Sequence, residues 1–322
     1  MDFLDAFFKS IPATPFSEII FGESKLYDIN SYTYLSELIF NNSELYVDDI
    51  KAITNQAIGG NPFYIKLLKN SQTGGSIIKD SAENFPDINN DHSNIVCQKP
   101  NSIFLHVELT AKYQMGWCML NSLTWKKVIN SLSSKITLKV DKNYSINEFK
   151  GWSFLNEISL PINAAIIADN FIMDKPETYE FNIFSIIEKI LPEELDNIDF
   201  DLAIITKRDL VNPRGKWGKL NTFIKEIRKK YVVNLSIFCT PSDEPHDRDI
   251  ITNYFRVHSG HSLDYYNKNN RIAKDTTIQF SGLNCSNDNT HRLLLNNYVN
   301  VTSRAKKEFD LFGSGEHRLL RK

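Results

Sequence analysis

Side chains that could bind or attack a phosphate group gather in one stretch of the sequence, Glu244–Tyr266 (EPHDRDIITNYFRVHSGHSLDYY). The stretch follows an apolar run typical of a buried strand and a turn that contains proline. A histidine such as His246 can act as a nucleophile or a general base. The guanidinium of Arg248 can hold a phosphate through two parallel hydrogen bonds. These residue types indicate phosphate recognition or phosphate chemistry.

The spacing resembles the signature of the phospholipase D superfamily, in which H-x-K-x4-D after a strand is followed by Gly-Ser-x-Asn. His246 stands in the histidine position, Arg248 in the lysine position, Asn253 in the aspartate position and Gly260 in the glycine position. In that family the histidine attacks phosphorus, the lysine neutralises phosphate oxygens and the aspartate orients a histidine. The resemblance implies these roles for the matching residues and covers roughly Ala164 to the C-terminus.

The chain is also similar to the phospholipase-D-like C-terminal domain of MIT-domain-containing proteins, and to HDR-motif phospholipase-D-like domains of uncharacterised bacterial proteins. The former carry H-D-R-x-I and then Gly-x-Gly-Leu-Asp-Tyr. The matching residues here are His246, Asp247, Arg248, Ile250, Gly260, Leu263, Asp264, Tyr265 and Tyr266. In that group the fold is regarded as non-catalytic, dimerises, and binds phospholipid or partner proteins. The N-terminal half does not resemble a MIT domain.

The altered positions favour recognition over catalysis. Arg248 keeps the positive charge, but Asn253 cannot supply the negative charge that stabilises an imidazolium; in the Ser-His-Asp triad the equivalent change costs about 10⁴-fold. Only one copy of the motif is present, so catalysis would require a homodimer. We therefore expect a non-catalytic recognition or dimerisation module that binds a phosphate-bearing ligand or a partner protein. The alternatives are a homodimeric, metal-independent phosphodiesterase or nuclease that uses His246, for instance in bacterial antiviral defence, and a membrane-surface adaptor.

Besides His246 and the other motif positions, five more residues are candidates for ligand binding. Arg208, Lys216 and Trp217 precede or begin an expected helix over 216–231, where a helix N-terminus could help to hold a phosphate, although a solvated charged face is the commoner explanation. His261 and Asp264 follow Gly260 within the motif stretch. Histidines at 258 and 261 would suit a metal pair on a helix, but the segment has the pattern of a strand and a turn. We expect neither a metal nor a cofactor.

Composition sets limits on partners. The 322 residues carry a net charge of −2, so nucleic-acid or phospholipid binding would need a local basic patch. The four cysteines are widely separated, which suits a reducing cytoplasm, and no apolar stretch is long enough to be a transmembrane segment or a signal peptide. We expect a cytoplasmic protein, bacterial in composition, that forms a homodimer and works in a complex with a partner protein.

The elements that would position the motif are clearest after residue 162. Apolar runs predict buried strands over 164–173, 201–206 and 232–239, with further strands over 250–257 and 277–280 and helices over 183–191, 216–231 and 293–309. Strands that alternate with helices predict an α/β phospholipase-D-like domain over 159–322, with a mostly parallel sheet covered by helices. Residues 1–158 are expected to form a helical-to-mixed domain, mainly helical over 14–69, with a flexible loop over 70–102 and strands over 102–109 and 135–140. The basic tail 313–322 is expected to fray.

Overall fold

The computed structural model describes residues 4–8, 43–47, 50–74, 77–80, 102–105, 117–119, 135–143, 149–157, 162–193, 195, 199–207, 211–240, 248–252, 255–282, 290–308 and 311–320. The chain divides into two compact units, one comprising Met1–Ser133 and the other mainly Ser134–Leu195 and Asp199–Lys322. The second unit begins earlier than the expected boundary at 158/159, because the strand over 135–140 pairs with the C-terminal sheet.

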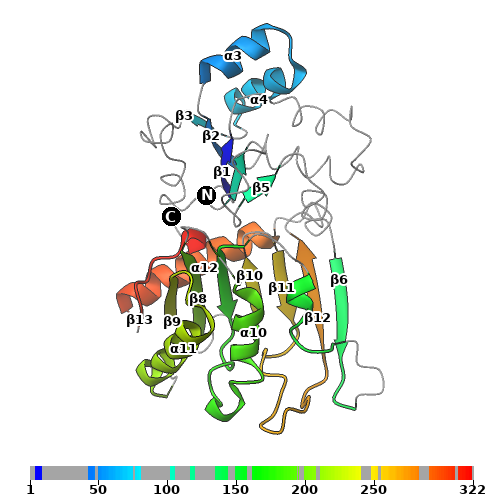
Figure 1. The fold of residues 1–322 in the computed structure, drawn as a ribbon, viewed down its shortest axis with the longest axis vertical. Helices are drawn as coiled ribbons and strands as arrows, with labels where there is room; N and C mark the ends of the chain where they lie inside the picture. Colours follow the sequence, from blue (N-terminus) through cyan, green and yellow to red (C-terminus); the bar gives the residue numbers. More distant parts are fainter. Residues whose placement is uncertain are drawn as a thin grey trace. The chain divides into compact units, whose positions relative to one another are not determined.

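The first unit contains a parallel sheet of five strands in the order β3-β2-β1-β4-β5 (Figure 1). The strands are β1 (Leu4–Phe8), β2 (Ser43–Val47), β3 (Ile77–Asp80), β4 (Ser102–Leu105) and β5 (Trp117–Met119). Two helices, α3 (Ile50–Ile58) and α4 (Pro62–Gln72), pack together through buried Ile53, Tyr64 and Leu67. The prediction was therefore wrong at β2, which falls in the expected helical region, and at β3, which falls in the expected loop. The helix expected around residues 34–39 lies outside the described residues.

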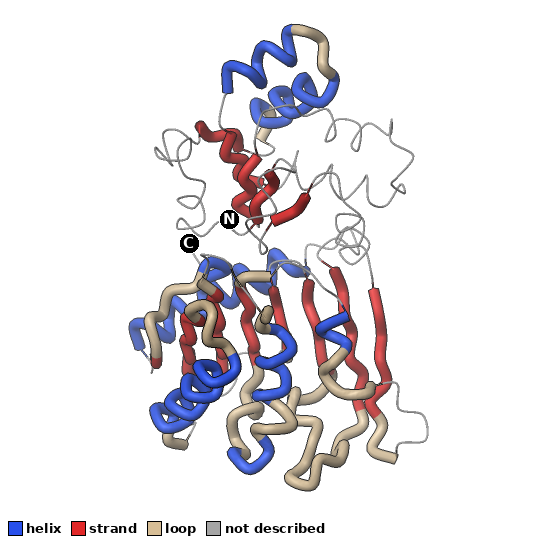
Figure 2. The backbone as a smooth tube through the Cα atoms, in the orientation of Figure 1, coloured by secondary structure: helices blue, strands red, loops and turns tan. Residues whose placement is uncertain are grey.

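The second unit is built on a mixed sheet of eight strands in the order β13-β9-β8-β7-β10-β11-β12-β6 (Figure 2). They are β6 (Lys135–Val140), β7 (Ala164–Ala168), β8 (Phe200–Lys207), β9 (Val233–Thr240), β10 (Asp249–Thr252), β11 (Phe255–Ser259), β12 (Thr276–Gly282) and β13 (Leu311–Phe312). The α/β class is confirmed, but the expectation of a mostly parallel sheet was wrong. Only the β7-β8 and β8-β9 pairs are parallel. The run expected as one strand over 250–257 is a hairpin whose two strands are only two residues apart, a connection too short for a parallel crossover.

Helices cover both faces of this sheet (Figure 1). On one face lie α9 (Phe154–Glu157), α10 (Ile183–Ile190) and α11 (Pro213–Ile227); on the other lies α12 (Thr290–Glu308). The core is apolar because every residue of β7 is buried, and α10 turns the buried side chains of Ile183, Ile186, Ile187 and Ile190 towards the sheet. A 3-10 turn (Pro176–Thr178) precedes α10. No described helix is long and apolar enough to cross a membrane.

The C-terminal segment is bound into the second unit, so the prediction of a fraying tail was wrong for residues 313–320. Gly313 has a φ of +96°, and a Cβ there would lie 2.0 Å from the carbonyl oxygen of Leu235. A final 3-10 turn, Arg318–Leu320, is buried. The Arg318 backbone N–H and Nε each donate to Asp201 Oδ2 at 3.0 Å. This buried ion pair accounts for Arg318, one of the basic residues of the tail.

Candidate functional site

The candidate site lies at one edge of the second sheet, which we call the strand-end edge. The carboxyl ends of the parallel strands β7, β8 and β9 meet there. Strand β10 runs antiparallel to β7, so it begins at this edge, and β11 ends there. Ligands of open α/β sheets commonly bind at the carboxyl ends of the strands. The described part of the motif, Arg248 and the residues from Gly260 onward, therefore lies where a ligand site is expected.

Arg248 occupies a central place on the strand-end edge. The pairing of Asp249 with Ala168 puts Arg248 opposite Asp169, and its carbonyl oxygen accepts a hydrogen bond of 2.9 Å from the Ser259 N–H. Because side chains alternate along a strand and Asp249 faces α12, Arg248 is directed to the opposite face, where α10 and α11 lie. Its side chain is half-buried, and no hydrogen bond or ion pair joins it to another residue among those described.

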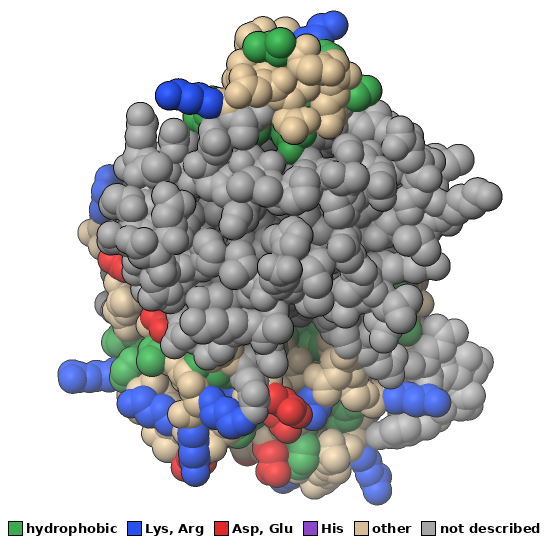
Figure 3. All heavy atoms as spheres, turned by 45° about the horizontal axis from the view of Figure 1, so that its top comes forward, with side chains coloured by type: hydrophobic (Ala, Val, Ile, Leu, Met, Phe, Trp, Pro, Cys, Tyr) green, Lys and Arg blue, Asp and Glu red, His purple; other side chains and the backbone are tan. Residues whose placement is uncertain are grey.

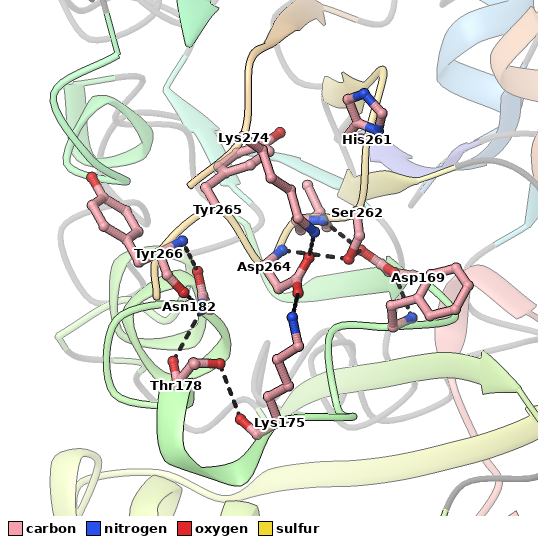
Figure 4. Close-up of polar contacts among 12 residues, drawn as sticks. Asp169, Lys175, Thr178, Asn182, His261, Ser262, Asp264, Tyr265, Tyr266 and Lys274 are labelled. Carbon is pink, nitrogen blue, oxygen red and sulfur yellow. Dashed lines mark hydrogen bonds and ion pairs between the residues drawn. The ribbon is translucent and has the colours of Figure 1, made fainter. Parts of the chain in front are cut away.

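Asp169 is held rigidly beside Arg248. Its carboxylate accepts hydrogen bonds from the Phe171 N–H (2.7 Å), from the Ser262 hydroxyl (2.8 Å) and from the Leu263 N–H (Figure 4). The side chain is buried, and burial raises the pKa of Asp169, although these three hydrogen bonds oppose the rise. The carboxylate thus ties the loop after β7 to the loop after β11. Its acceptor capacity is largely used by the protein itself.

Asp264, one of the expected ligand-binding residues, is the centre of an ion-pair cluster. Its carboxylate is buried and is approached by Lys274 Nζ and, at 3.6 Å, by Lys175 Nζ (Figure 4). Since two ammonium groups face one carboxylate here, the cluster carries a surplus of positive charge. Lys175 is 58% exposed and so can turn towards a ligand, which makes it the accessible part of the cluster. Asp264 itself serves to position the lysines rather than to contact an anion.

His261 and Gly260 lie on the exposed loop that follows β11. The imidazole of His261 points away from the Asp169 and Asp264 contacts (Figure 4), and its backbone N–H donates to Ser259 Oγ at 3.2 Å. A Cβ at Gly260 would lie 2.9 Å from Thr276 Oγ1. His261 is therefore available to solvent, whereas Gly260 allows the loop to approach β12.

Two lysines, Lys207 and Lys216, lie beside the end of β7 on the side away from β10. Lys207 Nζ forms an ion pair of 2.6 Å with Asp174 and lies 4.8 Å from the centre of the Phe171 ring. Lys216 is buried, and its ammonium donates to the Met173 carbonyl oxygen. Burial lowers the pKa of Lys216; the charge of Asp174 opposes this, and the charge of Lys207 adds to it. Both lysines bind the segment that follows β7, Lys207 through Asp174 and Lys216 through the Met173 carbonyl oxygen.

The start of α11 explains why Lys216 reaches this place. The helix begins at Pro213, earlier than expected, and Asn212, with a φ of 51°, caps it by accepting a 3.1 Å hydrogen bond from Gly215 N–H. Pro213 has no N–H, and the N–H groups of Gly215 and Lys216 both donate to Asn212, so among these first-turn residues Arg214 supplies the N–H left for a ligand. Trp217 is turned instead towards β9, where its indole Nε1 donates to the Leu235 carbonyl at 3.4 Å. Trp217 thus anchors α11 to the sheet.

Among the candidate residues, Arg248, Lys216, Gly260, His261 and Asp264 lie at the strand-end edge or on the loops beside it. His246, Asn253 and Arg208 lie outside the described residues. Sequence reasoning did not single out Lys207, Lys175 or Lys274 as site residues. Lys207 could have been found, because it is the last residue of a buried parallel strand and so must lie at the strand-end edge. Lys274 could not, because its approach to Asp264 depends on the path of the loop before β12.

A second polar cluster, centred on Asp249, was also missed. This fully buried carboxylate accepts hydrogen bonds from Arg256 Nε (2.8 Å) and from the Tyr298 hydroxyl of α12 (2.9 Å), and it lies 2.9 Å from His258 Nδ1. Burial alone would raise the pKa of Asp249, but the hydrogen bonds and charges of His258 and Arg256 outweigh it and leave the pKa below its ordinary value. His258 is thus engaged by Asp249 rather than paired with His261. No three potential metal ligands come together anywhere in the described ranges.

The charges at the molecular surface are mixed in sign. On the face shown in Figure 3, the described Lys and Arg side chains lie beside Asp and Glu side chains. This agrees with the net charge of −2 and means that any preference for anions must be local. The strand-end edge offers such a local preference, because its carboxylates are engaged while several of its cations are partly exposed.

Comparisons with known proteins identify no family. No protein-family model matches the chain, and no curated protein matches it. Among solved structures, one match is to TrmBL2, an archaeal chromatin protein with a novel mode of DNA binding. The two chains are 14% identical, the match covers 90% of this chain and 96% of the TrmBL2 chain, and the TM-score is 0.27. A likeness at that TM-score supports no argument about fold or function.

Proposed function

We propose that the second unit is a non-catalytic recognition module that binds a phosphate-bearing ligand at the strand-end edge. One observation carries the proposal: the cations Arg248, Lys207 and Lys216 surround the end of β7, while the acidic groups there are engaged by the protein. Arg248 immediately precedes β10 and lies opposite Asp169. Lys207 ends β8 on the other side of β7. Two strand spacings, roughly 10 Å, separate their backbones. The register places Lys207 on the face of Asp249 and Arg248 on the other face, so a phosphate bound by both would lie beyond the end of β7 rather than over either face.

The electrostatics of the site favour an anion over a cation. Asp169 already accepts three hydrogen bonds, Asp264 is matched by two lysines and Asp174 by Lys207. A bound metal would have to displace these contacts. A phosphate would instead reduce the repulsion that Lys207 exerts on Lys216 and could accept a hydrogen bond from the Arg214 N–H in the first turn of α11.

Recognition without turnover is supported by what the motif lacks. Asn253 stands in the aspartate position of the motif, and the chain carries one copy of the motif. Two of the chain's other histidines are also occupied: His258 is held by Asp249, and His317 is buried with both ring nitrogens engaged. A homodimer and a partner protein remain predictions that follow from the family resemblance.

The proposal is tested by calorimetric titration of the full chain with inorganic phosphate at constant ionic strength. Arg248→Ala should weaken phosphate binding by roughly 10-fold or more, since a hydrogen bond to a charged group contributes about 1.5–3 kcal/mol. Lys229→Ala is the matched control: it removes an exposed positive charge beyond the other end of α11 and should leave binding unchanged. Equal weakening by both substitutions, or no phosphate binding by the parent protein, would refute an anion site at this edge.

The same protein should not hydrolyse bis(4-nitrophenyl) phosphate in the presence of EDTA. If it does, and if His246→Ala abolishes the activity, the proposal of a non-catalytic module is wrong and the homodimeric phosphodiesterase takes its place. If the activity survives in His246→Ala, it comes from a contaminant, and the binding result alone decides.

A further inference from the structure

One end of the second sheet presents an open polar face. Strands β11, β12 and β6 lie beyond the part of the sheet that α12 covers, since α12 contacts β9 and reaches β10 through Tyr298 (Figure 1). Along β12 the side chains alternate, with Ile278 and Phe280 buried on one face and Thr277 and Gln279 exposed on the other. The exposed residues share the face of Asp249, because Gln279 pairs with His258 and His258 contacts Asp249.

The register defines which side chains make up this face. Arg256, Ser281 and Lys135 lie side by side across the three strands. The next row on the same face is His258, Gln279 and Thr137, and the third contains Thr277 and Lys139. We call this set the open sheet face: Arg256, His258, Thr277, Gln279, Ser281, Lys135, Thr137 and Lys139. All are exposed or half-buried, and each is either basic or an uncharged hydrogen-bonding residue.

Negative charge on this side of the sheet is neutralised or lies at its margin. Asp249 is fully buried and is matched by Arg256 and His258. Past the third row, Asp275 forms a 3.3 Å ion pair with Lys142 and also interacts electrostatically with Lys139, so the charge of Lys139 is partly offset. The His258 ring is 35% exposed, and its Nδ1 is fixed by Asp249, so the ring has a set orientation with its other edge turned outward. The open sheet face therefore has a net positive potential with many hydrogen-bond donors.

From this arrangement we propose that the open sheet face binds the phosphate backbone of double-stranded nucleic acid, independently of the site at the strand-end edge. A repeated array of lysine, hydroxyl and amide groups fits a polyanion with regularly spaced phosphates. The face has no aromatic side chain on which unpaired bases could stack, which disfavours a single strand. The residues that make up the face also include no apolar side chain that could insert into a lipid layer. Contact through phosphates alone predicts binding without sequence preference.

Edge protection is the simpler explanation for the two lysines of β6, which ends the sheet order. Lysines on an edge strand discourage pairing with other strands. That role would not explain why the inner strands β11 and β12 also carry only basic and uncharged polar groups on this face. It also predicts that loss of the lysines causes self-association, without any effect on nucleic-acid affinity.

The test is fluorescence anisotropy of a 30-base-pair DNA duplex of arbitrary sequence, with an RNA duplex alongside, titrated with the full chain from about 50 to 200 mM salt. In the parent protein the logarithm of affinity should fall linearly with the logarithm of salt concentration. Each phosphate contact adds about 0.9 to that slope. The double variant Lys135→Gln, Lys139→Gln should reduce the slope by about 1.8 and weaken binding by at least ~10-fold near 0.1 M salt.

Gln279→Glu places a carboxylate at the centre of the open sheet face and should weaken binding further. The matched control, Lys225→Gln with Lys229→Gln, removes the same charge from exposed positions on and after α11 and should behave as the parent protein. Arg248→Ala should also leave duplex binding intact, which separates this proposal from the phosphate site. Unchanged affinity in the double variant, tighter binding of oligo-dT than of the duplex, or binding only to phosphatidylserine vesicles would each overturn the inference.

Discussion

Acidification should loosen the second unit through one buried histidine, His317. Its side chain is 3% exposed. Its Nε2 donates to the Ala165 carbonyl of β7 at 3.0 Å, and its Nδ1 accepts from the Leu319 N–H at 3.2 Å. Both nitrogens are satisfied only in the neutral ring, because a proton on Nδ1 would face the Leu319 N–H. Burial, together with the charge of Arg318, lowers the pKa of His317 to about 4, and the charge of Asp201 opposes this.

The sign and size of the effect follow from linkage. The unfolded chain takes up a proton at this histidine near pH 6.5, whereas the folded chain does so only near pH 4, so stability is lost as the pH falls between these values. Each pH unit in that window corresponds to about 1.4 kcal/mol, giving about 2 kcal/mol at pH 5 and about 3 kcal/mol once the folded form is also protonated. At pH 7 and above the histidine contributes no pH dependence.

The assay must report on the second unit alone, since a chain of two units need not unfold in one step. Hydrogen exchange of the peptides that contain β7 and Arg318–Leu320, measured from pH 7.5 to 4.5, meets this need once intrinsic exchange rates are corrected for pH. The parent protein should lose protection in these peptides as the pH falls below 6.5. His317→Gln should be less stable at pH 7.5 but should show a flatter profile, because it cannot titrate.

The control for this experiment is His261→Gln, which changes an exposed histidine and should keep the parent profile. Parallel profiles for the parent protein and His317→Gln would refute the reasoning, since the acid sensitivity would then arise elsewhere. Asp249 does not confuse the result: its lowered pKa weakens the fold only as the pH falls below the ordinary range of a carboxyl group, under the window measured here.

Two further substitutions test how the second unit is held together, each read by urea unfolding of the full chain. Gly313→Ala should lower the free energy of unfolding by at least ~3 kcal/mol, because φ is +96° and the new Cβ would clash with the Leu235 carbonyl oxygen. Gly260→Ala is the control: its φ is ordinary and its Cβ would meet only the side-chain oxygen of Thr276, so it should cost far less. Equal costs for the two substitutions would contradict this account. Asp249→Asn should cost about 3 kcal/mol because it leaves the half-buried Arg256 guanidinium without its carboxylate. Tyr298→Phe should cost about 1 kcal/mol because it removes the hydrogen bond to Asp249; a larger cost for Tyr298→Phe than for Asp249→Asn would contradict this account.

The sequence was most informative where burial alone decides the structure. The runs 164–173, 201–206 and 232–239 each predict a buried strand, and β7, β8 and β9 lie within or across them. Helices α10, α11 and α12 were also predicted to within a few residues, since their apolar faces repeat with helical spacing. The first unit was harder: β1, β2 and β3 are short, and their pairing partners lie far apart in the sequence, so periodicity carries little signal.

The polar contacts that hold the second unit together were not predictable in the same way. Asp201 and Arg318 are 117 positions apart, and nothing local marks them as a pair. The same holds for Asp249 and Tyr298, which meet only because α12 returns across the sheet. Arg248 could be placed at the start of a strand because the motif ties it there. Its edge could not be predicted, because a parallel sheet would put that start opposite the carboxyl ends, and only the antiparallel pairing of β10 with β7 brings it to the strand-end edge. A residue whose position follows from one element is predictable; a contact between distant elements requires the topology.

The topology also separates the proposed phosphate site from the buried contacts of the C-terminal segment, because the two lie at opposite ends of strands β7 and β8. At the strand-end edge the loops after β7 and β11 meet, and Asp169 joins them through three hydrogen bonds, so cations can be held near one another at the surface. At the opposite edge the C-terminal segment closes the sheet through His317 and Arg318, both of which are buried. Acid should therefore loosen the contacts of His317 before it affects the lysines and Arg248 at the strand-end edge, which keep their charge as the pH falls. If phosphate binding is lost at the same pH at which β7 loses its protection from hydrogen exchange, the two edges are coupled through the sheet. If binding persists to a lower pH, the two edges act independently, as the separation of their contacts predicts.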